Sequence, residues 1–86
     1  MITIEYAPAF LRQLKKLPPE LQEEAQEKIT LFKNRSNHRR LKVHKLKGDL
    51  VGRWSFWVNY HDRIVFKWLS DTEVGLLAIG NHSIYN

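Results

Sequence analysis

The C-terminal part of the chain places two residues that can do chemistry directly after a strand. An apolar run from Val74 to Ile79 stops at Gly80, and His82 and Tyr85 follow it. A run that is apolar on both faces needs burial from both sides, and it presents the polar residues beyond its end at the rim of a sheet. A histidine exchanges protons near neutral pH, and a tyrosine can contact a base. The tail is therefore a candidate site.

The sequence offers little for a metal or a cofactor. It contains no cysteine, no closely spaced pair of histidines and no Gly-rich phosphate loop. His44, His61 and His82 fall on separate expected strands and could converge, but no carboxylate cluster completes a metal site. We therefore expect no metal and no cofactor.

Positive charge is concentrated in the first half of the chain. The net charge is +5, and the basic excess peaks at residues 33–42, which read KNRSNHRRLK. Such a segment attracts polyanions through phosphate contacts and counterion release. Two alternatives stay open, a solvated basic loop and a surface for an acidic protein partner.

The length predicts one domain that spans residues 1–86. Packing alone must stabilise it, because disulfides are excluded. Three Trp, three Tyr and four Phe are more than so small a core must hide, so we expect some aromatic rings on a working surface. The N-terminus lacks a signal-peptide pattern, and no apolar run approaches the ~20 residues that span a bilayer. We expect a soluble, intracellular protein with no membrane contact.

Hydrophobic spacing predicts an α+β fold with the order β-α-α-β-β-β-β. Residues 1–6 alternate like a strand, Pro8 suits the first turn of a helix, and Pro18 ends that helix. Pro19 opens a second helix, and the two helices should form a hairpin. Strands are expected at 41–46, 53–60, 64–69 and from 74 onward, with turns at 48–49, 61–62 and 70–72. The last four strands should form an antiparallel meander that the helices cover on one face.

Three motifs in this order resemble the RelE/ParE superfamily of bacterial toxins from type II toxin–antitoxin systems. They are HKLKG at 44–48 followed by GRWS at 52–55, YHDRIVF at 60–66, and IGNHSIY at 79–85. The resemblance covers nearly the whole chain and implies a helical hairpin on an antiparallel sheet. RelE-like, YafQ-like and YoeB-like members are ribosome-dependent mRNA endonucleases, whereas ParE-like members inhibit DNA gyrase.

The resemblance implies a catalytic set of four residues. His82 and Tyr85 match the histidine and the aromatic residue of the family's C-terminal motif, and Arg63 matches an arginine that binds the scissile phosphate. His44 lies where YafQ-like members have a histidine. Cleavage without a metal needs a base for the 2′-OH, a cation for the phosphorane and an acid for the leaving oxygen. Each residue also has a structural alternative, such as an ion pair between Arg63 and a carboxylate.

The resemblance also implies RNA contacts near these residues. Lys45 and Lys47 flank His44 and resemble paired lysines that bind phosphate and activate the base in RelE-like members. Trp57 can stack on a base. The predicted RNA-binding residues are Lys45, Lys47, Arg39, Arg40, Lys42, Arg53 and Trp57.

The strand after GRWS departs from the family pattern. Residues 56–59 read Phe-Trp-Val-Asn, where YoeB-like and RelE-like members have an arginine. If Trp57 faces the site, the positive charge at the phosphate must come from Arg63 and the lysines. A slip of one residue would turn Trp57 away from the site. The departure leaves open a mechanism based on His44 and His82, or a weak or inactive member.

Two classes of function therefore stay open. One is a metal-independent endoribonuclease that forms a 2′,3′-cyclic phosphate on the ribosome, and the other is a ParE-like or degenerate binding module without enzyme activity. In both cases the resemblance implies an acidic cognate antitoxin, and a toxin–antitoxin complex that binds its own promoter DNA. For the endoribonuclease it adds the ribosome and mRNA as partners. The expected location is the cytoplasm of a bacterium or an archaeon.

Overall fold

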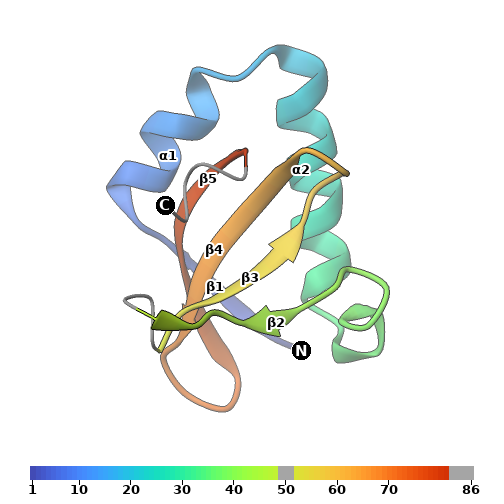
Figure 1. Ribbon diagram of the computed structural model, residues 1–86, viewed down its shortest axis with the longest axis vertical. Coiled ribbons are helices and arrows are strands. Elements are labelled where there is room, and N and C mark those ends of the chain that lie inside the picture. Colours follow the sequence, from blue (N-terminus) through green and yellow to red (C-terminus); the bar gives the residue numbers. More distant parts are fainter. Residues whose placement is uncertain (49–51, 82–86) are drawn as a thin grey trace.

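The computed structural model describes residues 1–48 and 52–81. Figure 1 shows a helical hairpin that packs against one twisted sheet. In chain order the elements are β1 (Thr3–Tyr6), α1 (Pro8–Lys15), α2 (Pro19–Phe32), the 3₁₀ helix η1 (Arg35–Asn37), β2 (His44–Lys45), β3 (Trp54–Trp57), β4 (Asp62–Trp68) and β5 (Glu73–Asn81). The predicted α+β class and element order are confirmed.

The sheet is mixed, with the strand order β1-β5-β4-β3-β2. Strands β2 to β5 form the predicted antiparallel meander, while β1 lies parallel to β5, with Thr3 opposite Glu73. The parallel pair is possible because the whole helical hairpin connects β1 to the rest of the sheet. Strand β5 therefore lies between β1 and β4 and is paired along both edges.

Prolines set the start of each helix as predicted. Pro8 and Pro19 are the first residues of α1 and α2, where a missing N–H costs nothing. The connection between the helices is tied by Gln22, whose side-chain amide donates to the Leu17 carbonyl at 2.8 Å. Neither helix within residues 1–48 and 52–81 is long and apolar enough to cross a membrane.

The core lies between the helices and one face of the sheet. Alternate residues of the strands point into it, including Phe56 of β3 with Ile64 and Phe66 of β4, all fully buried. Phe32, the last residue of α2, stacks on Phe56 with ring centroids 4.5 Å apart and meets Phe66 edge-on at 4.9 Å. Aromatic pairs of this geometry add to the burial energy, so Phe32 fixes where α2 meets the sheet.

Two predicted strands are shorter in the structure. The strand expected at 41–46 is reduced to His44–Lys45, because Leu41 turns into the core at 2% exposure and Lys42 adopts a left-handed φ of 60°. The strand expected at 53–60 ends at Trp57. Beyond it, the Asn59 side-chain oxygen accepts the backbone N–H groups of His61 and Asp62, each at 2.8 Å, and these bonds turn the chain.

Replacing Phe32 by alanine should lower the free energy of unfolding by about 3–5 kcal/mol, because the change leaves a cavity among stacked rings. Chemical denaturation followed by tryptophan fluorescence measures the loss. Leu11→Ala is the control, since Leu11 is 40% exposed, and it should cost less than about 1 kcal/mol. Equal losses in the two variants would contradict a core centred on Phe32.

Candidate functional site

Strand register divides the candidate residues between two faces of the sheet. Trp57 pairs with Arg63, and Ser55 pairs with both His44 and Val65. Opposed residues point to the same side, so these five side chains share one face, here called the distal face. The helices cover the other face. The structure therefore answers the question of register: Trp57, rather than Phe56, lies on the side of Arg63.

Arg63 is held tightly at the end of the β3–β4 hairpin. Its side chain is 4% exposed, and its Nη1 donates to the carbonyls of Asn59 at 2.7 Å and Asp62 at 3.1 Å. The guanidinium carbon lies 4.0 Å from the ring centroid of Trp57. The carbonyl oxygens and the ring face stabilise the positive charge of the guanidinium. Arg63 thus braces the hairpin and brings a permanent positive charge to the distal face.

His44 is exposed on the distal face and has a defined tautomer. Its Nδ1 lies 2.8 Å from the backbone carbonyl of Lys42. A carbonyl only accepts hydrogen bonds, so Nδ1 must be the donor, and the neutral ring carries its lone pair on Nε2. The left-handed backbone of Lys42 belongs to the same turn. His44 is therefore arranged to accept a proton at Nε2.

One of the two lysines near His44 lies on the other face of the sheet. Lys45 pairs with Trp54, and its Nζ lies 5.9 Å from the Trp54 ring centroid, on the face that the helices cover. Lys47 is exposed beyond the end of β2. The paired arrangement around His44 that the resemblance implies is therefore absent for Lys45 in this structure, because neighbouring residues of a strand point to opposite faces.

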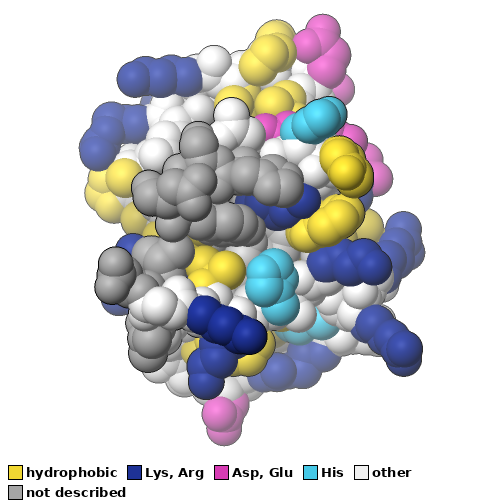
Figure 2. All heavy atoms as spheres, in the orientation of Figure 1, with side chains coloured by type: hydrophobic (Ala, Val, Ile, Leu, Met, Phe, Trp, Pro, Cys, Tyr) yellow, Lys and Arg dark blue, Asp and Glu magenta, His cyan; other side chains and the backbone are white. Residues whose placement is uncertain are grey.

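The basic segment, residues 33–42, is anchored to the core at His38. The His38 ring stacks on Phe32 with centroids 4.6 Å apart, and its Nε2 hydrogen-bonds the Phe32 carbonyl at 2.7 Å. Arg39, Arg40 and Lys42 are exposed. Figure 2 shows Lys and Arg side chains along the side of the molecule near this segment, and acidic side chains near the first half of α2. The segment therefore presents its charges from a fixed backbone.

Arg53 and Trp57 complete the described part of the predicted set. The backbone carbonyl of Arg53 accepts from the Leu46 N–H at 2.8 Å, which extends the β2–β3 pairing by one step. Arg53 is exposed, and alternation places it on the distal face with Ser55. Trp57 is half-buried, and the Nζ of Lys42 lies 5.9 Å from its ring centroid. The distal face thus groups His44, Arg53, Trp57 and Arg63.

His82 and Tyr85 lie outside the described residues, so their roles stay predictions. Strand β5 ends at Asn81, whose Cα partner is Asp62, and Gly80 pairs with Arg63. The last described residue therefore lies at the hairpin end of β4. Within residues 1–48 and 52–81, no three His, Cys, Asp or Glu side chains come together to hold a metal ion.

Tyr60 is a candidate that the sequence prediction missed. It is 73% exposed, and its ring meets Trp57 edge-on with centroids 6.1 Å apart. The prediction placed Tyr60 at the end of a strand with alternating burial. The sequence feature that could have predicted its exposure is its position directly after Asn59. An Asx turn at Asn59 directs the next side chain toward solvent.

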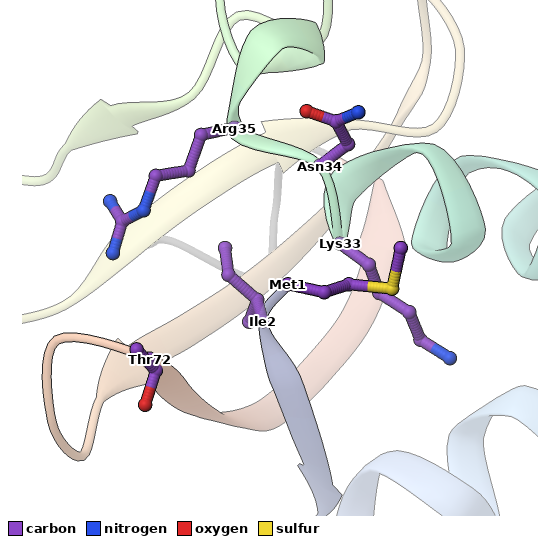
Figure 3. Close-up of a pocket in the computed structure, with 6 residues that line it drawn as sticks. All are labelled: Met1, Ile2, Lys33, Asn34, Arg35 and Thr72. Atoms are coloured by element: carbon purple, nitrogen blue, oxygen red, sulfur yellow. The ribbon is translucent and has the colours of Figure 1, made fainter.

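A hollow beside the N-terminus does not gather functional groups. It has a volume of about 330 Å³ and lies among Met1, Ile2, Lys33, Asn34, Arg35 and Thr72. Figure 3 shows the side chains of Lys33 and Arg35 pointing away from each other. The Arg35 guanidinium donates to the Asp71 carbonyl and lies 4.8 Å from the Trp68 ring centroid. We therefore place the candidate site on the distal face.

Comparison with known proteins supports the fold assignment. No protein-family model matches the sequence, and no curated protein matches it. The solved toxin–antitoxin complex RelBE2 of Mycobacterium tuberculosis superposes with a TM-score of 0.74 at 21% identity, over 94% of this chain and 98% of that one. This chain has the RelE/ParE-like toxin fold. The YoeB–YefM complex of Staphylococcus aureus gives 0.73 at 19% identity, over 95% and 98% of the two chains. A YafQ mutant of E. coli gives 0.72 at 18%, over 99% and 98%.

The RelE-like fold explains why sequence motifs far apart meet at one place. The hairpin end of β4 carries Arg63, β3 carries Trp57, and β2 carries His44. These three strands are neighbours in the sheet, so their outward residues form one surface.

His44 in its neutral form should carry its proton on Nδ1, since only a donor can bond the Lys42 carbonyl. The ¹⁵N chemical shifts of the neutral ring, measured by NMR, distinguish the tautomers. His61 is the control, because it is exposed in the hairpin turn and should favour the Nε2–H form usual in water. An Nε2–H form of His44 would contradict the hydrogen bond from Nδ1 to the Lys42 carbonyl.

Replacing Arg63 by lysine should lower the free energy of unfolding by about 1.5–3 kcal/mol, because an ammonium cannot keep the two carbonyl bonds and the ring stacking together. Arg53→Lys is the matched control at an exposed position and should change it by less than about 0.5 kcal/mol. Urea denaturation measures both. If Arg63→Lys is as stable as the wild type, the guanidinium does not brace the hairpin.

Proposed function

We propose that this protein is the toxin of a type II toxin–antitoxin system and that it cleaves mRNA on the ribosome. The main support is the arrangement on the distal face, where His44 has a fixed proton-accepting nitrogen on the same face as the guanidinium of Arg63. The RelE-like fold supports the toxin role, since the neighbours in fold include toxins solved as toxin–antitoxin complexes.

In the proposed reaction the 2′-oxygen of a ribose attacks the adjacent phosphorus. Nε2 of His44 takes the 2′-OH proton, and the bond between phosphorus and the 5′-oxygen breaks. His82 protonates that oxygen, with Tyr85 orienting a base next to it. The products are a 2′,3′-cyclic phosphate and a 5′-OH end. Arg63 offsets the negative charge of the phosphorane, and no metal is needed.

The exposed cations support an RNA substrate. Arg39, Arg40, Lys42 and Arg53 are all exposed, and the Nζ of Lys42 lies 5.9 Å from the ring centroid of Trp57. Lys45 and Lys47 at the sheet edge add charge that ribosomal RNA can meet. Contacts of this kind release counterions, so affinity for the ribosome should fall steeply with salt.

We further propose an acidic antitoxin as the partner. The solved structures of RelBE2 and of YoeB–YefM are toxin–antitoxin complexes. A net charge of +5 favours an acidic, partly disordered chain that folds on binding. The complex would bind its own promoter DNA through the antitoxin, in the cytoplasm of a bacterium or an archaeon.

A second candidate is a ParE-like inhibitor of DNA gyrase without enzyme activity. One observation favours it: Arg63 is 4% exposed and bonded to backbone carbonyls, which suits a structural role. Residues 56–59 of the adjacent strand and turn contain no arginine, which the resemblance to YoeB-like and RelE-like members leads one to expect there. A chain of this kind would arrest growth by binding alone.

Induced expression of the wild type should arrest growth and give cuts in translated mRNA that follow codon phase. His44→Gln should lower cleavage by about 10²–10⁴-fold, because it removes the base, and so should His82→Ala. Primer extension on total mRNA locates the cuts. His61→Gln is the matched control, since His61 lies in the hairpin turn, and it should cleave like the wild type.

Three other outcomes would each contradict part of this proposal. Growth arrest without cuts, together with loss of DNA supercoiling, would replace the proposal by the gyrase inhibitor. Cuts of equal strength in His44→Gln would remove His44 from the mechanism. No arrest by the wild type, at expression levels confirmed by immunoblot, would overturn the toxin assignment.

A further inference from the structure

A second hollow lies between α2 and the β3–β4 hairpin. Its volume is about 290 Å³, and its walls include Glu24, Lys28, Arg40, Trp57, Asn59 and Tyr60. This volume is at the small end of the usual range for ligand pockets, about 300–1,000 Å³, which suits one nucleotide better than a larger ligand. The residues come from three parts of the chain that do not adjoin in sequence.

The hollow is fixed by a hydrogen bond across the two elements. The Asn59 side-chain nitrogen donates to Oε1 of Glu24 at 2.7 Å, while the Asn59 oxygen holds the backbone of the turn. The hairpin tip is thereby tied to α2. A pocket held in this way loses little entropy when a ligand binds.

Aromatic rings form one wall of the hollow. Tyr60 is 73% exposed and meets the Trp57 ring edge-on at 6.1 Å. An exposed ring adds little burial energy, which a domain of this size needs for its stability. Unpaired nucleobases stack on such rings whatever their sequence.

Charged groups form the other walls. Lys28 and Arg40 supply positive charge for a phosphate, and Glu24 supplies a carboxylate. Only Oε1 of Glu24 bonds to Asn59. A carboxylate has acceptor sites beyond one hydrogen bond, and it pairs with the amino groups of adenine, cytosine and guanine. Uracil has no such amino group.

We propose that this hollow binds one unpaired nucleotide of an RNA strand and prefers a base with an amino group. The base stacks on Tyr60, its amino group donates to Glu24, and its phosphate meets Arg40 and Lys28. Trp57 contacts both Tyr60 and the Arg63 guanidinium, so the nucleotide lies next to the one held at Arg63. This inference rests on the proposed function for its choice of RNA as the ligand. It adds a second nucleotide-binding site, next to the cleavage site, that discriminates between bases.

Fluorescence anisotropy with labelled hexamers of oligo-A, oligo-C and oligo-U tests the site on the purified full chain, without any cleavage step. The wild type should bind oligo-A and oligo-C more tightly than oligo-U. Tyr60→Ala should weaken binding of oligo-A and oligo-C by about tenfold, and Tyr60→Phe should restore it, because a phenyl ring still stacks. Tyr6→Ala is the control at another exposed tyrosine and should bind like the wild type.

Glu24→Gln tests the selectivity. A glutamine oxygen still accepts from Asn59, so the hollow stays formed, but the negative acceptor is lost and the preference for oligo-A and oligo-C over oligo-U should vanish. Wild-type affinity in Tyr60→Ala, or equal affinity of the wild type for the three hexamers, would overturn the proposal. So would a Tyr60→Ala variant that loses antitoxin binding but keeps RNA binding.

The two proposals can fail separately. If ribosomal mRNA stays uncut while Tyr60→Ala still weakens binding of the hexamers, the nucleotide site holds and the endoribonuclease proposal falls. If mRNA is cut in codon phase and Tyr60→Ala leaves both binding and the choice of cut sites unchanged, the nucleotide site is wrong and the endoribonuclease proposal holds.

Discussion

The buried ring of Phe32 is the contact on which the rest of the structure depends. It ends α2, packs on Phe56 and Phe66 of the sheet, and carries the stacked ring of His38 on its other side. A single side chain thus joins the helical hairpin, the sheet and the basic segment. Because interiors are close-packed, moving this ring would shift all three. Six residues after Phe32 the chain reaches His38, then enters the core again at Leu41 and makes the left-handed turn that fixes His44. The geometry of the proposed base therefore derives from core packing.

Sheet pairing imposes the second constraint. Alternation sends Phe56 and Ile64 into the core, so Trp57 and Arg63 must share the distal face. Once there, the guanidinium is shielded by the indole and by the turn carbonyls. A buried cation costs desolvation energy unless hydrogen-bond acceptors replace the water around it. The carbonyls of Asn59 and Asp62 supply such acceptors, and the Asn59 side chain holds the turn in which both lie. The shape of the hairpin and the position of the charge therefore depend on the same turn.

The element order followed from the sequence because it depends on local signals. Pro8, Pro19 and the helical spacing of apolar residues act within a few residues of the chain, so both helices were predicted correctly. The strand predicted at 41–46 is only His44–Lys45, because Leu41 packs into the core instead of pairing, and no local pattern reveals this. The face of Trp57 depends on register, and a period of two does not fix register by itself. Lys45 and His44 are neighbours in one strand, so alternation alone sends their side chains to opposite faces. The carbonyl partners of Arg63 lie at a turn whose shape the sequence only partly specifies.

Three residues whose conformation, burial or exposure is unfavourable for stability lie in one region of the described structure. Lys42 has a backbone conformation that costs energy for a residue with a side chain, Arg63 is a charged group nine-tenths buried, and Tyr60 is an aromatic ring left in water. Contacts with Trp57 connect all three. Small domains have little stability to spare, so such costs persist where function requires them. Core packing explains the helical side of the sheet without any reference to function. It does not explain why three costly features surround Trp57. The proposed binding of RNA, a charged polymer with aromatic bases, would account for all three.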